Sequence, residues 1–239
     1  MSIAASAVAS LRTAARSCAA ALLPQDCFLC AAPSGDSLLC PACTASLPRL
    51  TAERCPVCAL PTPAARICGA CLKQAPNFDA TLAVFSYEFP VDALIQSLKY
   101  AHHLACADFL GKALARISTP RRPDLILPVP LAAARLAQRG FNQALEIARP
   151  LARVLGAPLE IRRIHRCRDT TPQASLPWKE RAKNIRHAFE CQIDLTGQTV
   201  LLVDDVMTTG ATLDELARTL KAHGAARVEN RVLARALRD

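Results

Sequence analysis

Aromatic residues are scarce in this 239-residue chain, which has one tryptophan, two tyrosines and seven phenylalanines. Hydrophobic residues nevertheless make up 51% of it, so alanine, leucine and valine must form most of the core. Sequence-tolerant binding of single-stranded nucleic acid usually relies on stacking aromatics, and their scarcity argues against that class of protein. The length suits one ordinary domain with a small accessory domain.

Long apolar runs are also missing, because no stretch approaches the roughly 18 apolar residues that a membrane-spanning helix needs. Residues 1–23 have no basic segment at their start, and Arg12 and Arg16 interrupt the apolar stretch, which argues against a secretory signal. A short amphipathic N-terminal helix over residues 1–23 is expected instead. The chain is therefore expected in the cytoplasm, where clustered cysteines bind metal more often than they form disulfides.

Cysteine, in contrast, is abundant, with twelve residues in all. Eight of them form four Cys-x-x-Cys pairs: Cys27/Cys30, Cys40/Cys43, Cys55/Cys58 and Cys68/Cys71. Two such pairs complete a closed tetrahedral Cys₄ site, so the four predict two structural zinc ions. Pairing the first with the second and the third with the fourth closes the shorter loops and is favoured. A redox pair would need a βαβ setting, and iron–sulfur clusters commonly show other spacings.

The cysteines also affect the charge and the domain boundaries. The formal net charge of +9 falls to about +5 if eight thiolates bind two Zn²⁺, a mildly basic balance that suits many phosphate-binding enzymes. Residues 24–75 lack apolar periodicity and are expected to form a double zinc ribbon stabilised by metal. Residues 76–239 are long enough for an α/β domain.

The strongest motif of that domain is a strand, a turn and a helix. Residues 200–203 are continuously apolar, as is typical of a central parallel strand buried on both faces. Asp204 and Asp205 end the strand, and a turn with threonine and glycine follows. Leucines at helical spacing from Leu213 onward place that turn at a helix N-terminus.

This geometry predicts a sugar-phosphate site. Amides at a helix N-terminus favour an anion, and Thr208, Thr209 and Thr212 add hydroxyl donors. Gly210 permits close approach of the backbone to a phosphate. The two aspartates can accept hydrogen bonds from vicinal sugar hydroxyls or hold Mg²⁺, so the ligand resembles ribose 5-phosphate at the carboxyl end of a strand. The alternative is a plain strand end followed by a helix cap.

The same run lacks the Gly-Lys of a P-loop and the Gly-x-Gly-x-x-Gly of dinucleotide folds. It resembles instead the phosphoribosyl pyrophosphate (PRPP) signature of type I phosphoribosyltransferases. The resemblance implies a parallel sheet flanked by helices, Mg²⁺ bound with PRPP, and catalytic roles for the two aspartates. The PRPP-binding residues that it implies in this run are Val203, Asp204, Asp205, Thr208, Thr209, Gly210, Ala211 and Thr212.

Two further segments bear on the rest of PRPP. In the resembled fold, the loop after the strand near residues 125–130 binds pyrophosphate, which assigns Arg135 and Arg139 to that group; solvated basic side chains are the alternative. Residues 166–178 are expected to form a long loop that closes over the reacting centre, with Lys179 and Arg181 as catalytic residues.

A helix that begins at Pro90 is expected to end with Lys99, His102 and His103. These three residues are interpreted as partners of the helix dipole rather than as catalysts.

The cysteine pairs and residues 204–212 combine with three shorter motifs: Leu-Lys-Tyr at 98–100, Arg-Gly-Phe-Asn-Gln at 139–143 and Arg-x-x-Asn at 181–184. Together they resemble the ComF/GntX family over nearly the whole chain. Members are bacterial cytoplasmic proteins with zinc ribbons before a phosphoribosyltransferase domain. Some are linked to natural transformation and others to gluconate utilisation. Some have a single four-cysteine ribbon, whereas this chain has two sets.

Three functions follow, in decreasing order. The first is a PRPP-dependent phosphoribosyltransferase with an unknown acceptor. The second is a non-catalytic protein that senses PRPP or receives a nucleic-acid 5-phosphoribosyl end. The third is a competence factor that binds single-stranded DNA or DNA-processing proteins. The sequence leaves the oligomeric state open.

Overall fold

The computed structural model describes residues 25–117, 122–168 and 184–237, and the expected helix at 1–23 lies outside them. The chain divides into two compact units, with the boundary between Leu47 and Pro48. This boundary falls within the segment 24–75 that the cysteine spacing predicts to be one double ribbon. Each unit is described by itself.

The smaller unit contains little regular structure. Its antiparallel strands are β1 (Gln25–Asp26) and β2 (Pro33–Gly35), and helix α2 (Pro41–Ala45) follows. The buried hydrophobic residues that the structure describes in this unit are Cys27, Leu39, Cys40 and Leu47. So small a core cannot stabilise the fold alone, and bound metal has to supply much of the stability.

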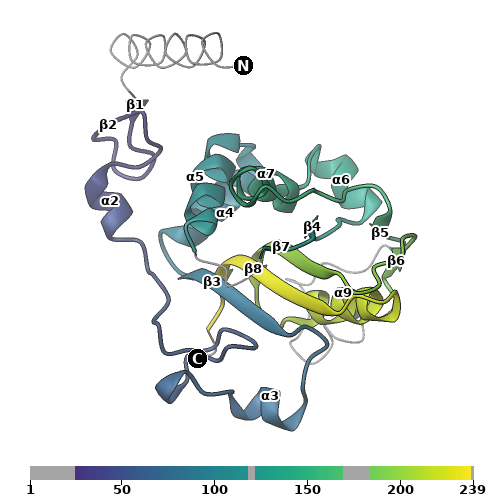
Figure 1. Ribbon diagram of the computed structural model, residues 1–239. Helices are drawn as coiled ribbons and strands as arrows, with labels where there is room; N and C mark the ends of the chain where they lie inside the picture. Colours follow the sequence, from purple (N-terminus) through teal and green to yellow (C-terminus); the bar gives the residue numbers. More distant parts are fainter. Residues whose placement is uncertain (1–24, 118–121, 169–183, 238–239) are drawn as a thin grey trace, which may run out of the picture. The chain divides into compact units, whose positions relative to one another are not determined.

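The larger unit is built on a four-stranded parallel sheet (Figure 1). Its strand order is β3 (Ala80–Ser86), β8 (Arg227–Arg235), β7 (Thr199–Met207) and β4 (Leu125–Pro128). β7 is a central strand whose residues 200–203 are all buried, which confirms the apolar run as a strand covered on both faces.

Helices cover both faces of this sheet (Figure 1). α4 (Val91–Ala101), α5 (Leu104–Ala115) and α7 (Gln143–Leu155) lie on one face, and α9 (Ala211–Ala222) lies on the other. Gly111 allows α5 and α7 to pack closely, because a Cβ there would lie 2.7 Å from the Ile147 carbonyl oxygen. This α/β architecture agrees with the fold expected from the sequence.

The second cysteine segment belongs to the larger unit, where it includes the short helices η1 (Pro63–Ala65) and α3 (Gly69–Lys73). Cys55, Cys58 and Ala59 are buried in the same hydrophobic cluster as Phe78 and Leu213. Its backbone is also bonded to the sheet, since the Thr81 amide donates to the Pro56 carbonyl at 3.1 Å. This cysteine segment is therefore part of the core around the sheet.

Two antiparallel strands, β5 (Ile164–Arg166) and β6 (Phe189–Cys191), form a separate small sheet. The sequence predicts a strand at residues 159–164, but Leu159 makes only an isolated bridge with Ile126, and the strand begins at Ile164. A three-residue strand carries too little alternation to be recognised from sequence. None of the helices in the described ranges is both long and apolar enough to cross a bilayer.

Candidate functional site

The turn between β7 and α9 has the geometry of an anion site. Gly210 adopts φ +83°, and a Cβ there would lie 2.7 Å from Met207 Cε, so the tight turn requires glycine. The Ala211 amide donates to Thr209 Oγ1 at 3.1 Å. The amides of Thr209 and Gly210 meet no protein acceptor within the described residues, so they can donate to a ligand.

Asp204 and Asp205 lie just before this turn. Asp205 is 4% exposed, and its amide donates to Asp204 Oδ1 at 2.9 Å. Burial and the adjacent charge of Asp205 raise the pKa of Asp204 to about 8. The pair therefore carries about one negative charge near neutral pH, so it can both donate and accept hydrogen bonds.

Lys99 is the residue whose role the sequence interpretation missed. Its Nζ lies 2.7 Å from Asp205 Oδ2, and the two side chains are only 18% and 6% exposed. Although burial opposes the charge, the carboxylate of Asp205 raises the pKa of Lys99. The interpretation of Lys99 as a partner of the helix dipole was wrong. Its position four residues after buried Ile95 was the signal, since it places Lys99 on the inward face of α4.

The two histidines interpreted in the same way lie elsewhere. His102 ends α4 in the left-handed conformation, and its Nε2 lies 3.1 Å from the Arg139 carbonyl oxygen. His103 Nδ1 lies 2.8 Å from Ser97 Oγ. Neither histidine lines the cleft described next.

A cleft of about 490 Å³ joins these groups to the predicted arginines. Arg135 and Arg139 lie on the short helix α6 (Ala133–Arg139), which replaces the expected loop. Burial and the charge of Arg139 lower the pKa of Arg135, so the two guanidinium groups increase the positive potential that favours an anion. Lining residues from these segments are Lys99, Tyr100, Arg135, Arg139, Arg166, Asp204, Asp205, Thr208, Thr209, Gly210, Ala211 and Thr212.

Tyr100 and Arg166 also line the cleft, and the sequence assigned no role to either. The guanidinium group of Arg139 lies 5.5 Å from the ring centre of Tyr100, and that of Arg166 lies 5.9 Å from the ring centre of Phe189. These contacts hold both arginine side chains against aromatic rings.

Three of the predicted residues do not line the described cleft. Val203 is fully buried in β7, where its carbonyl accepts from the Val129 amide at 2.9 Å. Lys179 and Arg181 lie outside the described residues, as does most of the predicted loop 166–178.

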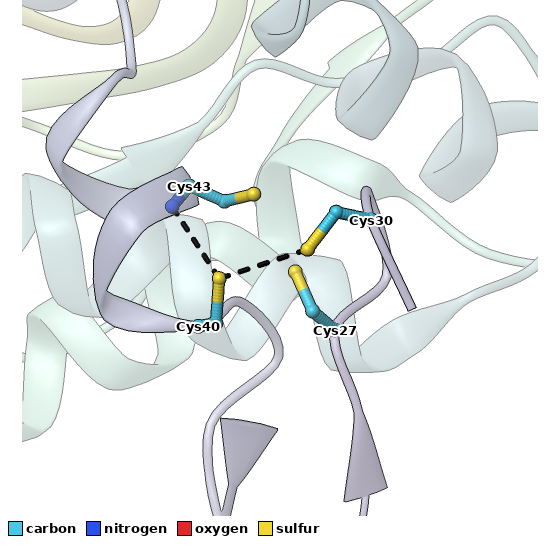
Figure 2. A group of neighbouring side chains, drawn as sticks. All are labelled: Cys27, Cys30, Cys40 and Cys43. Carbon is cyan, nitrogen blue, oxygen red and sulfur yellow. Dashed lines mark hydrogen bonds between the residues drawn. The ribbon is translucent and has the colours of Figure 1, made fainter. Parts of the chain in front are cut away.

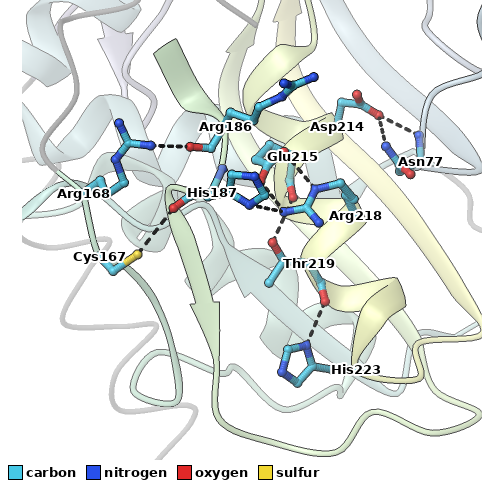
Figure 3. Close-up of polar contacts among 10 residues, drawn as sticks. All are labelled: Asn77, Cys167, Arg168, Arg186, His187, Asp214, Glu215, Arg218, Thr219 and His223. Carbon is cyan, nitrogen blue, oxygen red and sulfur yellow. Dashed lines mark hydrogen bonds and ion pairs between the residues drawn. The ribbon is translucent and has the colours of Figure 1, made fainter. Parts of the chain in front are cut away.

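A polar network fixes α9 to the residues that follow segment 169–183 (Figure 3). Glu215 accepts from the His187 amide at 2.7 Å and forms an ion pair with Arg218 at 2.6 Å. At the start of α9, Asp214 accepts from the amide and the side chain of Asn77, at 2.6 and 3.0 Å. These contacts hold the helix whose N-terminus forms the anion site.

The eight paired cysteines form two groups, Cys27/Cys30/Cys40/Cys43 and Cys55/Cys58/Cys68/Cys71. Within each group the sulfur atoms lie within 4.8 Å of one another, as the sequential pairing predicts, and Figure 2 shows the first group. Burial alone would raise the pKa of Cys55, but backbone amides from Cys68 and its neighbours lower it to about 7. These amides favour the thiolate, the form that binds metal, so both groups fit zinc ribbons.

Replacing Lys99 with methionine should lower the free energy of unfolding by about 3 kcal/mol, because Asp205 would lose its partner in a buried ion pair. Lys112→Met is a matched control, because Lys112 pairs with Asp108 where both side chains are more than half exposed. We expect the control to cost about 0–1 kcal/mol. Urea denaturation measures both values, and equal losses would contradict the assignment of Lys99 to a buried pair.

Asp204→Asn tests the raised pKa of Asp204. A carboxyl group of this kind contributes stability at acidic pH that is lost as the pH rises through about 8, because the buried group must then ionise. We expect the variant to gain stability relative to the wild type between about pH 4 and pH 8, on the order of a few kcal/mol. Thermal melts across this range provide the measurement. A stability difference independent of pH would refute the raised pKa.

Comparison with known proteins agrees with this architecture. Residues 141–239 match the phosphoribosyl transferase domain, and residues 18–72 match the double zinc ribbon domain. The DNA utilization protein YhgH of Salmonella typhimurium is 36% identical over 169 residues, which cover 68% of this chain and 74% of that protein. Competence protein F of Haemophilus influenzae is 34% identical over 171 residues, which cover 67% and 75%.

Competence protein ComFC of Bacillus subtilis is also similar, at 34% identity over 112 residues that cover 45% of this chain and 42% of that protein. The motifs, the fold and these relatives agree. The chain belongs to the ComF/GntX family of proteins that combine a double zinc ribbon with a phosphoribosyltransferase domain.

Proposed function

We propose that this protein binds PRPP in the cleft at the β7–α9 turn and transfers the 5-phosphoribosyl group to an acceptor. The observation that carries the proposal is the joint position of three kinds of group in one cleft. A helix N-terminus with threonine hydroxyls lies beside two acidic residues, and two arginines line the same cleft. A phosphate, a diol and a pyrophosphate are the groups that these side chains complement.

Each group has a distinct role in this proposal. The amides of Thr209 and Gly210, with the hydroxyls of the turn, donate to the 5-phosphate. Asp204 and Asp205 hydrogen-bond the ribose hydroxyls, and Lys99 holds Asp205 in place. Arg135 and Arg139 bind the pyrophosphate, because guanidinium groups can make bidentate contacts with phosphate oxygens.

Transfer forms a bond between the acceptor nucleophile and C1 of the ribose. The bond from C1 to the pyrophosphate oxygen breaks, and its electron pair leaves with pyrophosphate. The two arginines stabilise the charge that develops on this leaving group. The sugar gains oxocarbenium character, as in glycoside cleavage, so exclusion of water is essential. Lys179 and Arg181 remain proposed catalytic residues.

Metal ions complete the proposal. Mg²⁺ bound with PRPP would neutralise part of the pyrophosphate charge, and Asp204 and Asp205 are the carboxylates of the cleft that fit it. Two Zn²⁺ ions would occupy the Cys₄ groups, where four thiolates leave no open position for catalysis.

Incubation of the protein with PRPP and Mg²⁺ tests the transfer. We expect pyrophosphate to be released slowly by hydrolysis and faster when the right acceptor is added. Binding of PRPP by calorimetry without any release of pyrophosphate would instead favour a non-catalytic PRPP sensor. The absence of both would refute the proposal.

A role in DNA use is the second candidate, because relatives are named DNA utilization protein and competence protein. On this hypothesis the protein binds single-stranded DNA or DNA-processing proteins in the cytoplasm. A gel shift with single-stranded DNA tests it, and affinity should fall steeply as salt rises if phosphates are contacted. Weak binding that is independent of salt would count against it.

A further inference from the structure

The side chain of Arg235 connects the second cysteine group to the phosphate turn. Arg235 ends β8 and is 2% exposed. Its Nε donates to the carbonyl of Cys58 at 2.8 Å, and its Nη1 donates to the carbonyl of Met207 at 2.9 Å. Nη1 also donates to the carbonyls of Thr208 and Ala236. One guanidinium group therefore joins a predicted metal ligand to the residues that open the turn.

Apolar packing supplies a second connection between the same two places. Phe78 lies in the hydrophobic cluster that contains Cys55 and Cys58. Its ring also reaches the turn, because a Cβ on Gly210 would lie 3.7 Å from Phe78 Cζ. Tightly packed groups transmit displacement, so a change in the cysteine group should reach the turn by both routes.

The charge of a loaded metal site favours this arrangement. Four thiolates and one Zn²⁺ carry a net charge of about −2. A centre of that charge favours a cation beside it, and the Nε of Arg235 contacts the backbone of one of the four ligands. Loss of the metal would remove the negative charge and release the backbone that holds the Cys58 carbonyl.

We propose that Arg235 is a positioning residue through which metal bound at Cys55/Cys58/Cys68/Cys71 holds the turn of residues 207–210 in its anion-binding conformation. As regulation of the phosphate site, this inference rests on the proposed function. Metal at Cys27/Cys30/Cys40/Cys43, which belongs to the other unit, has no such connection among the described residues. The two zinc ribbons thus differ in role: only the second controls affinity for the sugar phosphate.

Hydrogen exchange of residues 207–212, followed by mass spectrometry, tests the coupling without any ligand. Arg235→Lys keeps the charge but loses the fork of donors, so we expect both metal ions to remain while exchange accelerates by about tenfold. Cys58→Ser should lose about one zinc ion per chain and accelerate exchange at least as much. Calorimetry should show affinity for ribose 5-phosphate falling by about tenfold in both variants.

Two controls separate this coupling from general damage. Arg227→Lys changes an arginine at the other end of β8, where the side chain is 42% exposed and pairs with Glu229, and it should leave exchange of the turn unchanged. Cys30→Ser should lose one zinc ion without affecting the turn. Exchange in Arg235→Lys equal to wild type would overturn the coupling, and so would equal effects of Cys58→Ser and Cys30→Ser. If exchange accelerates but the wild type does not bind ribose 5-phosphate, the coupling stands and the proposed function fails.

Discussion

Replacing Asp205 with alanine should weaken PRPP binding by about 100-fold or more. Asp205 is buried at the end of β7, next to the turn that is proposed to hold the 5-phosphate. Its carboxylate is proposed to accept from a ribose hydroxyl, and hydrogen bonds to charged groups are the stronger kind. Calorimetric titration of PRPP with Mg²⁺ into the wild type and the variant measures the loss.

The matched control for this experiment is Asp108→Ala. Asp108 also pairs with a lysine, but its side chain is 55% exposed on α5 and outside the cleft. We expect this control to bind PRPP as the wild type does. Circular dichroism checks that both variants are folded. Unchanged affinity in folded Asp205→Ala would remove the carboxylate from the PRPP site.

The second large effect concerns the cysteines. A Cys55→Ser/Cys58→Ser double variant should lose about 5 kcal/mol or more of stability in the larger unit, because metal binding contributes its free energy directly to folding. Cys55 is fully buried in the core around the sheet, so the loss of metal also leaves that core without one of its walls. Thermal unfolding monitored by circular dichroism measures the change.

The corresponding Cys27→Ser/Cys30→Ser variant provides the comparison. These cysteines lie in the smaller unit, so the melting transition of the sheet should remain close to that of the wild type. A similar loss in both double variants would show that the two ribbons stabilise the same folding unit.

Local patterns were sufficient to predict the centre of the site. Residues 200–203, the two aspartates and the threonine-rich turn follow one another along the chain, so strand, turn and helix can be read from their order. The spacing of the cysteine pairs was equally informative, since a knuckle needs only a few adjacent residues. In these segments the geometry depends on neighbours in sequence.

Contacts between distant segments could not be predicted in this way. Lys99 and Asp205 are 106 positions apart, and Arg235 reaches Cys58 from 177 positions away. A lysine near a helix end is more often a dipole partner, and only the packing of α4 beside β7 brings it to the acidic pair. Likewise, the attachment of the second cysteine segment to the sheet depends on contacts such as Pro56 to Thr81.

The central claim is that the amides of the β7–α9 turn bind the 5-phosphate. Titration of ribose 5-phosphate into ¹⁵N-labelled protein tests it directly by nuclear magnetic resonance. Hydrogen bonds to a phosphate should move the amide protons of Thr209 and Gly210 downfield, in step with saturation. If these two signals stay in place while ligand binds, the phosphate lies elsewhere and the proposed site is wrong.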